Sequence, residues 1–147
     1  MYPIILKIHQ ILSWLVLLAA AFALYRSWRG IIFKKQWFTA DKRAGLWLSV
    51  FVDVQILAGL LLYVVYSPVT RIVFTNMKAA MADAPVRFYA VEHILVMFVA
   101  AILVHIGRAK ARNTQFAARK HRISAFFYML ATALILTRIP WERIFSI

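Results

Sequence analysis

Four long apolar segments dominate this chain and restrict the folds that are open to it. They cover about residues 4–25, 44–66, 88–106 and 123–139, and segments rich in Lys and Arg separate them. A helix needs about 20 apolar residues, with a range of roughly 17–25, to cross the ~30 Å hydrocarbon core of a bilayer. Short connections favour antiparallel neighbours. The pattern predicts an all-α fold, an antiparallel up-down four-helix transmembrane bundle.

The composition leaves little room for anything outside the membrane. Of the 147 residues 64% are hydrophobic and only five are acidic, and the apolar residues fall in long blocks. This share exceeds that of ordinary soluble domains. We therefore expect a single membrane domain over residues 1–147, with no separate soluble domain.

The net charge of +13 would suggest nucleic acid as the partner of a soluble protein. Here the basic residues flank apolar segments, where they act as topology signals and contact anionic lipid headgroups. We expect membrane lipid as a partner and no nucleic acid. The chain has no cysteine, which excludes disulfides, thiolate metal sites, iron–sulfur clusters and covalent c-type haem. Histidine must carry most of any metal chemistry.

The first apolar segment has a rival interpretation as a cleavable signal, because Lys7 precedes it and residues 19–23 are small or apolar. The run exceeds the ~7–15 residues of a signal core, and its basic residues mostly follow it. We predict a permanent helix. Residues 26–43 are basic and aromatic and predict an interfacial connection. Within it, Thr39 can cap the next helix, and Asp41 suits its first turn.

The distribution of basic residues predicts the orientation. The first and third connections hold six Lys or Arg each, the second holds three, and the terminal parts hold one and two. The positive-inside rule places the first and third connections in the cytoplasm and both termini outside. We expect a multi-pass protein of the bacterial inner membrane.

Two histidines occupy matched positions in the first and third predicted helices. His9 and His93 each lie a few residues inside the outer end, so at ~1.5 Å per residue they share a depth. One imidazole on each face is what six-coordinate haem requires, and we predict His9 and His93 as the axial pair of a b-type haem. Lys7, Arg71 and Arg87 would neutralise the haem carboxylates. Glu92 would bond to His93 or fix its tautomer.

The other two histidines allow a second haem at the cytoplasmic side. His105 ends the third predicted helix and His121 begins the fourth. His121, however, stands among basic residues, where a solvated histidine is the ordinary case. His93 and His105 are separated by ~18 Å of helix and by a turn of ~120°, which opposes a shared face. One haem is favoured over two.

The histidines have a structural interpretation as well. A membrane histidine can hydrogen-bond across helices, with Asp53, Gln55 or Tyr89 as partner. Asp53 and Gln55 lie near the middle of the second segment, where a carboxyl group costs on the order of 3 kcal/mol, so Asp53 should face the bundle interior. These two residues could line a proton path, contact a quinone head group, bond to a haem edge or only join helices.

Several short motifs resemble those of a family of small bacterial four-span integral membrane proteins labelled cytochrome b-like. The motifs are Phe38-Thr-Ala-Asp41, Asp53-Val-Gln55, Gly59-Leu-Leu-Leu-Tyr63, Ser67-Pro68, Met77-Lys78, Val91-Glu-His93 and Ile139-Pro-Trp141. The resemblance covers nearly the whole chain and implies a four-span bundle in the inner membrane that binds haem b. Some members of the family have histidine where this chain has Asp53, which shifts the ligand role to His9 and His93.

Three functions follow as hypotheses. The first is an electron carrier with haem b between quinone or a partner subunit and an acceptor. The second is a haem-free accessory or assembly subunit of a larger respiratory or transport complex, and a homo-oligomer is compatible with either. The third is a proton-coupled transporter that uses Asp53. No nucleophile elbow, phosphate-binding loop or zinc protease motif is present, so a hydrolase is disfavoured.

Overall fold

Helices make up all the regular secondary structure of the computed structural model, which describes residues 1–146, and no strand occurs among these residues. The long helices are α1 (Tyr2–Ile32), α2 (Thr39–Leu61), α6 (His93–Arg112) and α7 (Ala117–Arg138). Between α2 and α6 lie a π-helical turn η1 (Leu62–Tyr66), three short helices α3 (Arg71–Thr75), α4 (Met77–Ala82) and α5 (Ala84–Arg87), and a second π-helical turn η2 (Phe88–Glu92). A short helix, α8 (Trp141–Ile144), follows α7. The all-α prediction is confirmed.

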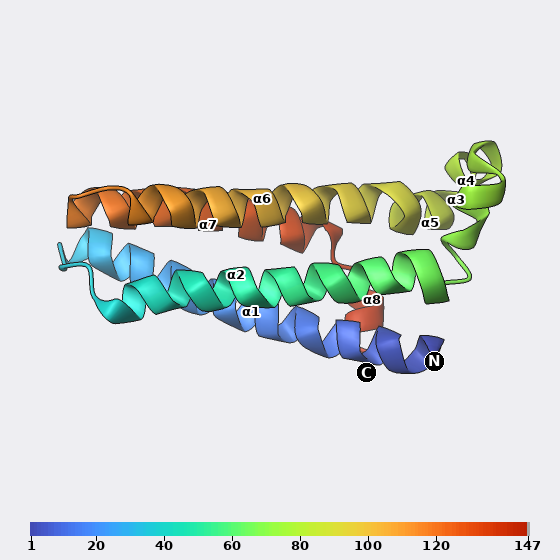
Figure 1. The fold of residues 1–147 in the computed structure, drawn as a ribbon, viewed down its shortest axis with the longest axis horizontal. Coiled ribbons are helices and arrows are strands. Elements are labelled where there is room, and N and C mark those ends of the chain that lie inside the picture. The colour runs from blue at the N-terminus through green and yellow to red at the C-terminus, as the bar shows by residue number, and fades with distance from the viewer. Residues whose placement is uncertain (147) are drawn as a thin grey trace.

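The four long helices lie side by side, and successive ones run in opposite directions (Figure 1). Both α1 and α6 pack against α2 and α7, so α1 and α6 face each other across a diagonal. The α1–α2 and α6–α7 connections, residues 33–38 and 113–116, lie at one end, which we call the basic end. The opposite end carries the N-terminus and α3 to α5, and we call it the cavity end.

Small residues form much of the contact between the long helices, while large apolar side chains point outward. Ala20, Ala100 and Ala131 are each 1% exposed, whereas Leu18 and Leu57 are each 66% exposed. Small residues let helix backbones approach closely, which is how helices associate where lipid surrounds them. The outward apolar side chains would be a liability in water.

Three helical segments are long and apolar enough to cross a membrane: Tyr2–Ile32, Thr39–Tyr66 and Ala84–Arg112. The prediction of four such spans is supported for these three. In α7 the uncharged stretch is only residues 123–137, because Arg122 precedes it and Arg138 follows it. At ~1.5 Å per residue this stretch is shorter than the ~30 Å hydrocarbon layer.

The predicted helix ends were too short at the basic end. Helix α1 continues from Tyr25 to Ile32, α6 continues to Arg112, and α7 begins at Ala117 instead of Ile123. Most basic residues predicted in the connections therefore lie on helix extensions. In α6 the last turn carries Lys110 and Arg112, where cations suit the negative end of the helix dipole. The second connection, residues 67–87, contains three short helices.

The start of α2 is held by Asp41 and not by Thr39, which is the first helical residue. The Asp41 Oδ2 atom accepts a hydrogen bond from the Phe38 backbone N–H at 2.7 Å. Its Oδ1 atom accepts one from Arg26 Nε of α1 at 2.8 Å. The Asp41 side chain is 4% exposed and that of Arg26 15%. One carboxylate thus caps α2 and also joins it to α1 through a buried ion pair.

Gly107 sets the approach of α6 to α7. A Cβ atom added there would lie 2.5 Å from the Phe127 Cβ, which is fixed to the backbone and cannot turn away. We expect Gly107→Val to lower the free energy of unfolding by about 1–3 kcal/mol, as overpacking usually does. Titration with SDS in mixed micelles, followed by circular dichroism, measures this change. Ala109→Val, at an exposed position of the same helix, is the control, and equal stability of the two variants would contradict the close contact.

Candidate cofactor site

A cavity of about 150 Å³ lies between the long helices and is lined mainly by apolar residues. Its polar lining groups include His9 and Ser13 of α1, Gln55 of α2, Tyr63 of η1, His93 of α6 and Arg143 of α8. A mostly apolar cavity with a few convergent polar groups is the usual form of a small-molecule site. The cavity is therefore the candidate functional site.

The two histidines predicted as a pair meet in this cavity. The ring centres of His9 and His93 lie 6.4 Å apart, with an interplanar angle of 69°. They reach each other across the diagonal between α1 and α6. A metal ion held between two imidazoles by bonds of about 2.0–2.1 Å would place the ring centres roughly 6–6.5 Å apart. The spacing of the pair fits a shared metal ion.

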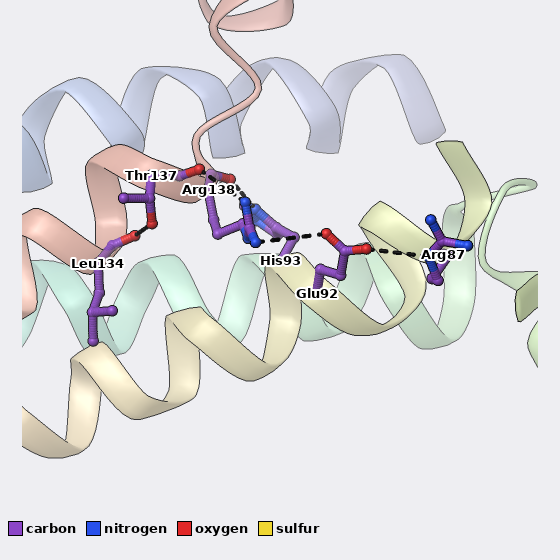
Figure 2. Close-up of polar contacts among 6 residues, drawn as sticks. All are labelled: Arg87, Glu92, His93, Leu134, Thr137 and Arg138. Atoms are coloured by element: carbon purple, nitrogen blue, oxygen red, sulfur yellow. Dashed lines mark hydrogen bonds and ion pairs between the residues drawn. The ribbon is translucent and has the colours of Figure 1, made fainter. Parts of the chain in front are cut away.

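His93 is oriented by the end of α7. Its Nδ1 atom lies 2.7 Å from the backbone carbonyl oxygen of Arg138 (Figure 2). This carbonyl ends a helix that Pro140 cannot continue, because proline has no N–H to donate. A carbonyl only accepts, so Nδ1 must carry the proton, and Nε2 of the neutral ring keeps its lone pair. A backbone carbonyl bonded to Nδ1 is a common support for a metal-binding histidine.

The ring of His9 is held by a longer contact than the ring of His93. Its Nε2 atom lies 3.3 Å from the Gln55 amide nitrogen, which also donates to Ser13 Oγ at 2.7 Å. The Nδ1 atom of His9 and the Oε1 atom of Gln55 are buried and have no hydrogen-bond partner. An unmatched buried polar atom costs about 1–3 kcal/mol, so a bound group that engages this ring would stabilise the site.

Gly59 provides room for the His9 ring. A Cβ atom at this position of α2 would lie 3.1 Å from Cε1 of His9. This contact is tight, so a side chain here would require the imidazole to shift by a few tenths of an ångström. Space for the His9 ring thus explains the glycine in the Gly59-Leu-Leu-Leu-Tyr63 motif.

Two π-helical turns lie at the cavity end. The hydroxyl of Tyr63 in η1 donates to the carbonyl of Ala90 in η2 at 2.9 Å. The second turn ends at Glu92, immediately before His93. Single π-helical turns within longer helices occur often at functional sites. Sequence reasoning did not find these turns, since no residue type marks them.

Glu92 does not contact His93 as predicted. Its carboxylate lies between Arg87 Nε at 3.2 Å and Arg138 Nη2 at 3.8 Å (Figure 2). Both partners are about two-fifths exposed, so these ion pairs contribute little by themselves. They link η2 to the same residue whose carbonyl holds His93.

The cations predicted to neutralise haem carboxylates do not line the cavity. Arg87 is paired with Glu92, Arg71 donates to the carbonyl of Val65, and Lys7 is not among the lining residues. Arg143 lines the cavity instead and lies over the Tyr89 ring, 4.4 Å from its centre. Sequence reasoning missed Arg143 because α8 folds back toward α1 after Pro140. The Gln10 amide donates to the Arg143 carbonyl at 2.8 Å, which holds α8 there.

Asp53 does not face the interior, contrary to the prediction. Its Oδ1 atom lies 2.7 Å from Nε2 of His105, and the side chains are 51% and 44% exposed. Gln55 lines the cavity. Residues two apart on a helix point about 200° apart at 3.6 residues per turn, so only one of the two could point inward.

His105 and His121 have different surroundings, so the fold does not form the second imidazole pair. His121 is 1% exposed, where a solvated position was the ordinary expectation. Its ring lies against Gly30 and 5.0 Å from the Trp37 ring, and its Nε2 atom lies 3.3 Å from the Gln36 carbonyl. His121 therefore joins α7 to the end of α1.

The described residues contain no group of three or more His, Cys, Asp or Glu side chains placed to hold a metal ion. Six-coordinate haem takes two protein ligands, and the His9–His93 pair supplies two. Comparison of the chain with protein-family models, curated proteins and solved structures finds no match. By its structure the chain is a helical protein with three segments able to cross a membrane and a cavity that contains two histidines.

Proposed function

We propose that this chain is a b-type haem-binding integral membrane protein that transfers electrons between quinone or a partner subunit and an acceptor. The observation that carries the proposal is the meeting of His9 and His93 in one cavity with ring centres 6.4 Å apart. Haem, when bound, supplies a reversible one-electron couple at its iron. The proposal includes the haem b binding that the resemblance to the proteins labelled cytochrome b-like implies.

The residues present have defined tasks in this proposal. His9 and His93 would ligate the iron, and the Arg138 carbonyl would keep the His93 ring in place. The Gln55 amide nitrogen donates to His9 Nε2, so this contact would have to open, or the amide oxygen would have to accept from the ring N–H, for His9 to offer a lone pair. Arg143 takes the role first given to Lys7, Arg71 and Arg87, because it is the cation that lines the cavity. The free volume of about 150 Å³ is below the roughly 300–1,000 Å³ of usual ligand sites, so the lining side chains must move apart when a porphyrin enters.

The same proposal includes four transmembrane helices in the bacterial inner membrane, with α7 as the fourth. Arg138 can extend its guanidinium toward the headgroups and so lengthen the effective span of α7. The basic end would face the cytoplasm, because residues 26–43 and 107–122, which lie at or beside it, hold six Lys or Arg each. Both termini would then lie outside.

A second candidate function is a haem-free accessory or assembly subunit. The half-exposed Asp53–His105 pair favours it, because ionisable groups in a membrane usually face protein or water. If this chain were part of a larger complex, another subunit would cover the pair, and the chain would need no cofactor for this role.

The test is to purify the chain in detergent from haem-replete membranes. We expect about one haem b per chain and a reduced spectrum with the sharp α-band of six-coordinate low-spin iron. Treatment with acidified acetone should remove the haem from the protein, because a chain without cysteine can bind haem only non-covalently in this way. A colourless, folded protein that also fails to take up added haemin would contradict the proposal and favour the accessory subunit.

A further inference from the structure

The outward face shared by α2 and α6 carries a polar pair that the proposed site does not use. Asp53 and His105 form a 2.7 Å contact, and each side chain is about half exposed. Asp53 lies near the midpoint of the segment Thr39–Tyr66, which is long and apolar enough to cross a membrane. Given the proposed membrane placement, the pair lies within the apolar part of both segments, with His105 one turn before Arg108 toward the basic end.

Such a position is unfavourable unless something covers it. Ionisable side chains within a membrane are costly and almost always face protein or water. The residues one turn away on the same faces are large, apolar and exposed: Val50 at 37%, Leu57 at 66% and Ile102 at 55%. The cavity described above does not extend to this face, since neither Asp53 nor His105 lines it. An apolar helical face with a polar centre fits another helical face, where polar groups bond across the contact.

We propose that a second copy of this chain covers this face and forms a two-fold symmetric dimer. Two copies inserted in the same orientation can be related by a two-fold axis along the membrane normal, which keeps the depth of every residue. Such an axis places α2 of one copy opposite α6 of the other. Asp53 and His105 lie at one depth because they contact each other, so Asp53 of each copy meets His105 of its partner. The face is complementary to itself in charge and in depth.

Cysteine cross-linking tests the geometry, since the native chain has no cysteine. Differently tagged copies carrying Leu57→Cys and Ile102→Cys are combined in liposomes and treated with a short bis-maleimide. We expect a cross-linked heterodimer. The matched control combines Leu18→Cys of α1 with Leu130→Cys of α7, exposed at 66% and 42%, and should give no cross-link. Equal cross-linking of both pairs, or of neither, would overturn the dimer.

Exchange of the two residues tests the polar centre. Fluorescence energy transfer between labelled copies, measured as the lipid-to-protein ratio rises, gives the dimer dissociation constant. Asp53→His should weaken the dimer up to about tenfold, because it removes the polar contact between the copies. The double variant Asp53→His/His105→Asp should restore native affinity, and circular dichroism checks folding in each. A wild-type monomer at every ratio, or no recovery in the double variant, would refute the proposal.

This inference rests on the proposed membrane placement and not on haem. Extraction of the membranes with alkaline carbonate separates the two outcomes. Release of the chain without detergent would show that the membrane placement is wrong. A chain that stays in the membrane but remains monomeric, or that associates only with another protein, would refute the dimer alone.

Discussion

A chain with His93→Ala is expected to lose six-coordinate haem completely. The reason is that the fold brings one imidazole to the cavity from each side of the α1–α6 diagonal, and no other histidine lines the cavity among the described residues. His9→Ala should have the same effect. Absorption spectra of the reduced proteins should lack the sharp α-band, and any haem that remains should be five-coordinate and high-spin. Added imidazole should restore the six-coordinate spectrum, because it can enter the space left by the missing ring.

His105→Ala is the matched control for these variants. It removes a histidine from the same helix as His93, but one that faces outward and contacts Asp53. Haem content and spectrum should stay at the wild-type level. Equal loss of haem in His105→Ala and His93→Ala would show that the cavity pair has no special role. Retention of the six-coordinate spectrum in both His9→Ala and His93→Ala would exclude the proposed ligands.

Asp41→Ala should produce the largest loss of stability at the basic end. The substitution leaves the Arg26 guanidinium, 15% exposed, without its partner and the Phe38 N–H without its acceptor. Breaking a buried ion pair by removal of one member costs about 3–5 kcal/mol. The free energy of unfolding, measured by SDS titration in mixed micelles, should fall by about this amount.

Asp83→Ala separates capping from ion pairing. Asp83 also caps a helix, accepting from the Val86 N–H at 3.0 Å, but it is exposed and no salt bridge to it is found in the described residues. Its replacement should cost about 1 kcal/mol, the usual value for a lost cap. If both aspartates cost the same, the contact with Arg26 contributes nothing measurable, and the capping bond alone explains Asp41.

The errors in the predicted site have a common physical cause. Helices α1 and α2 are apolar on nearly all sides, so their sequences do not show which side faces the other helices. For this reason Asp53 was assigned to the interior, although Gln55 is the residue that lines the cavity. His121 was expected to be solvated because charged residues flank it, yet it is 1% exposed beside Gly30 and Trp37. Only the packing of α7 against α1 explains this burial.

The helical class, the number and approximate position of the long helices, and the matched depth of His9 and His93 could all be predicted from the amino-acid sequence. These properties depend on apolar run length and on the rise per residue, which are local. The tertiary structure decided which side of each helix faces inward, which cation lines the cavity, and that the Arg138 carbonyl holds His93. Those features depend on the rotation of each helix about its axis and on the return of α8 toward α1. Both result from contacts between residues far apart in the chain, such as Gln10 with Arg143, which a uniformly apolar sequence does not encode locally.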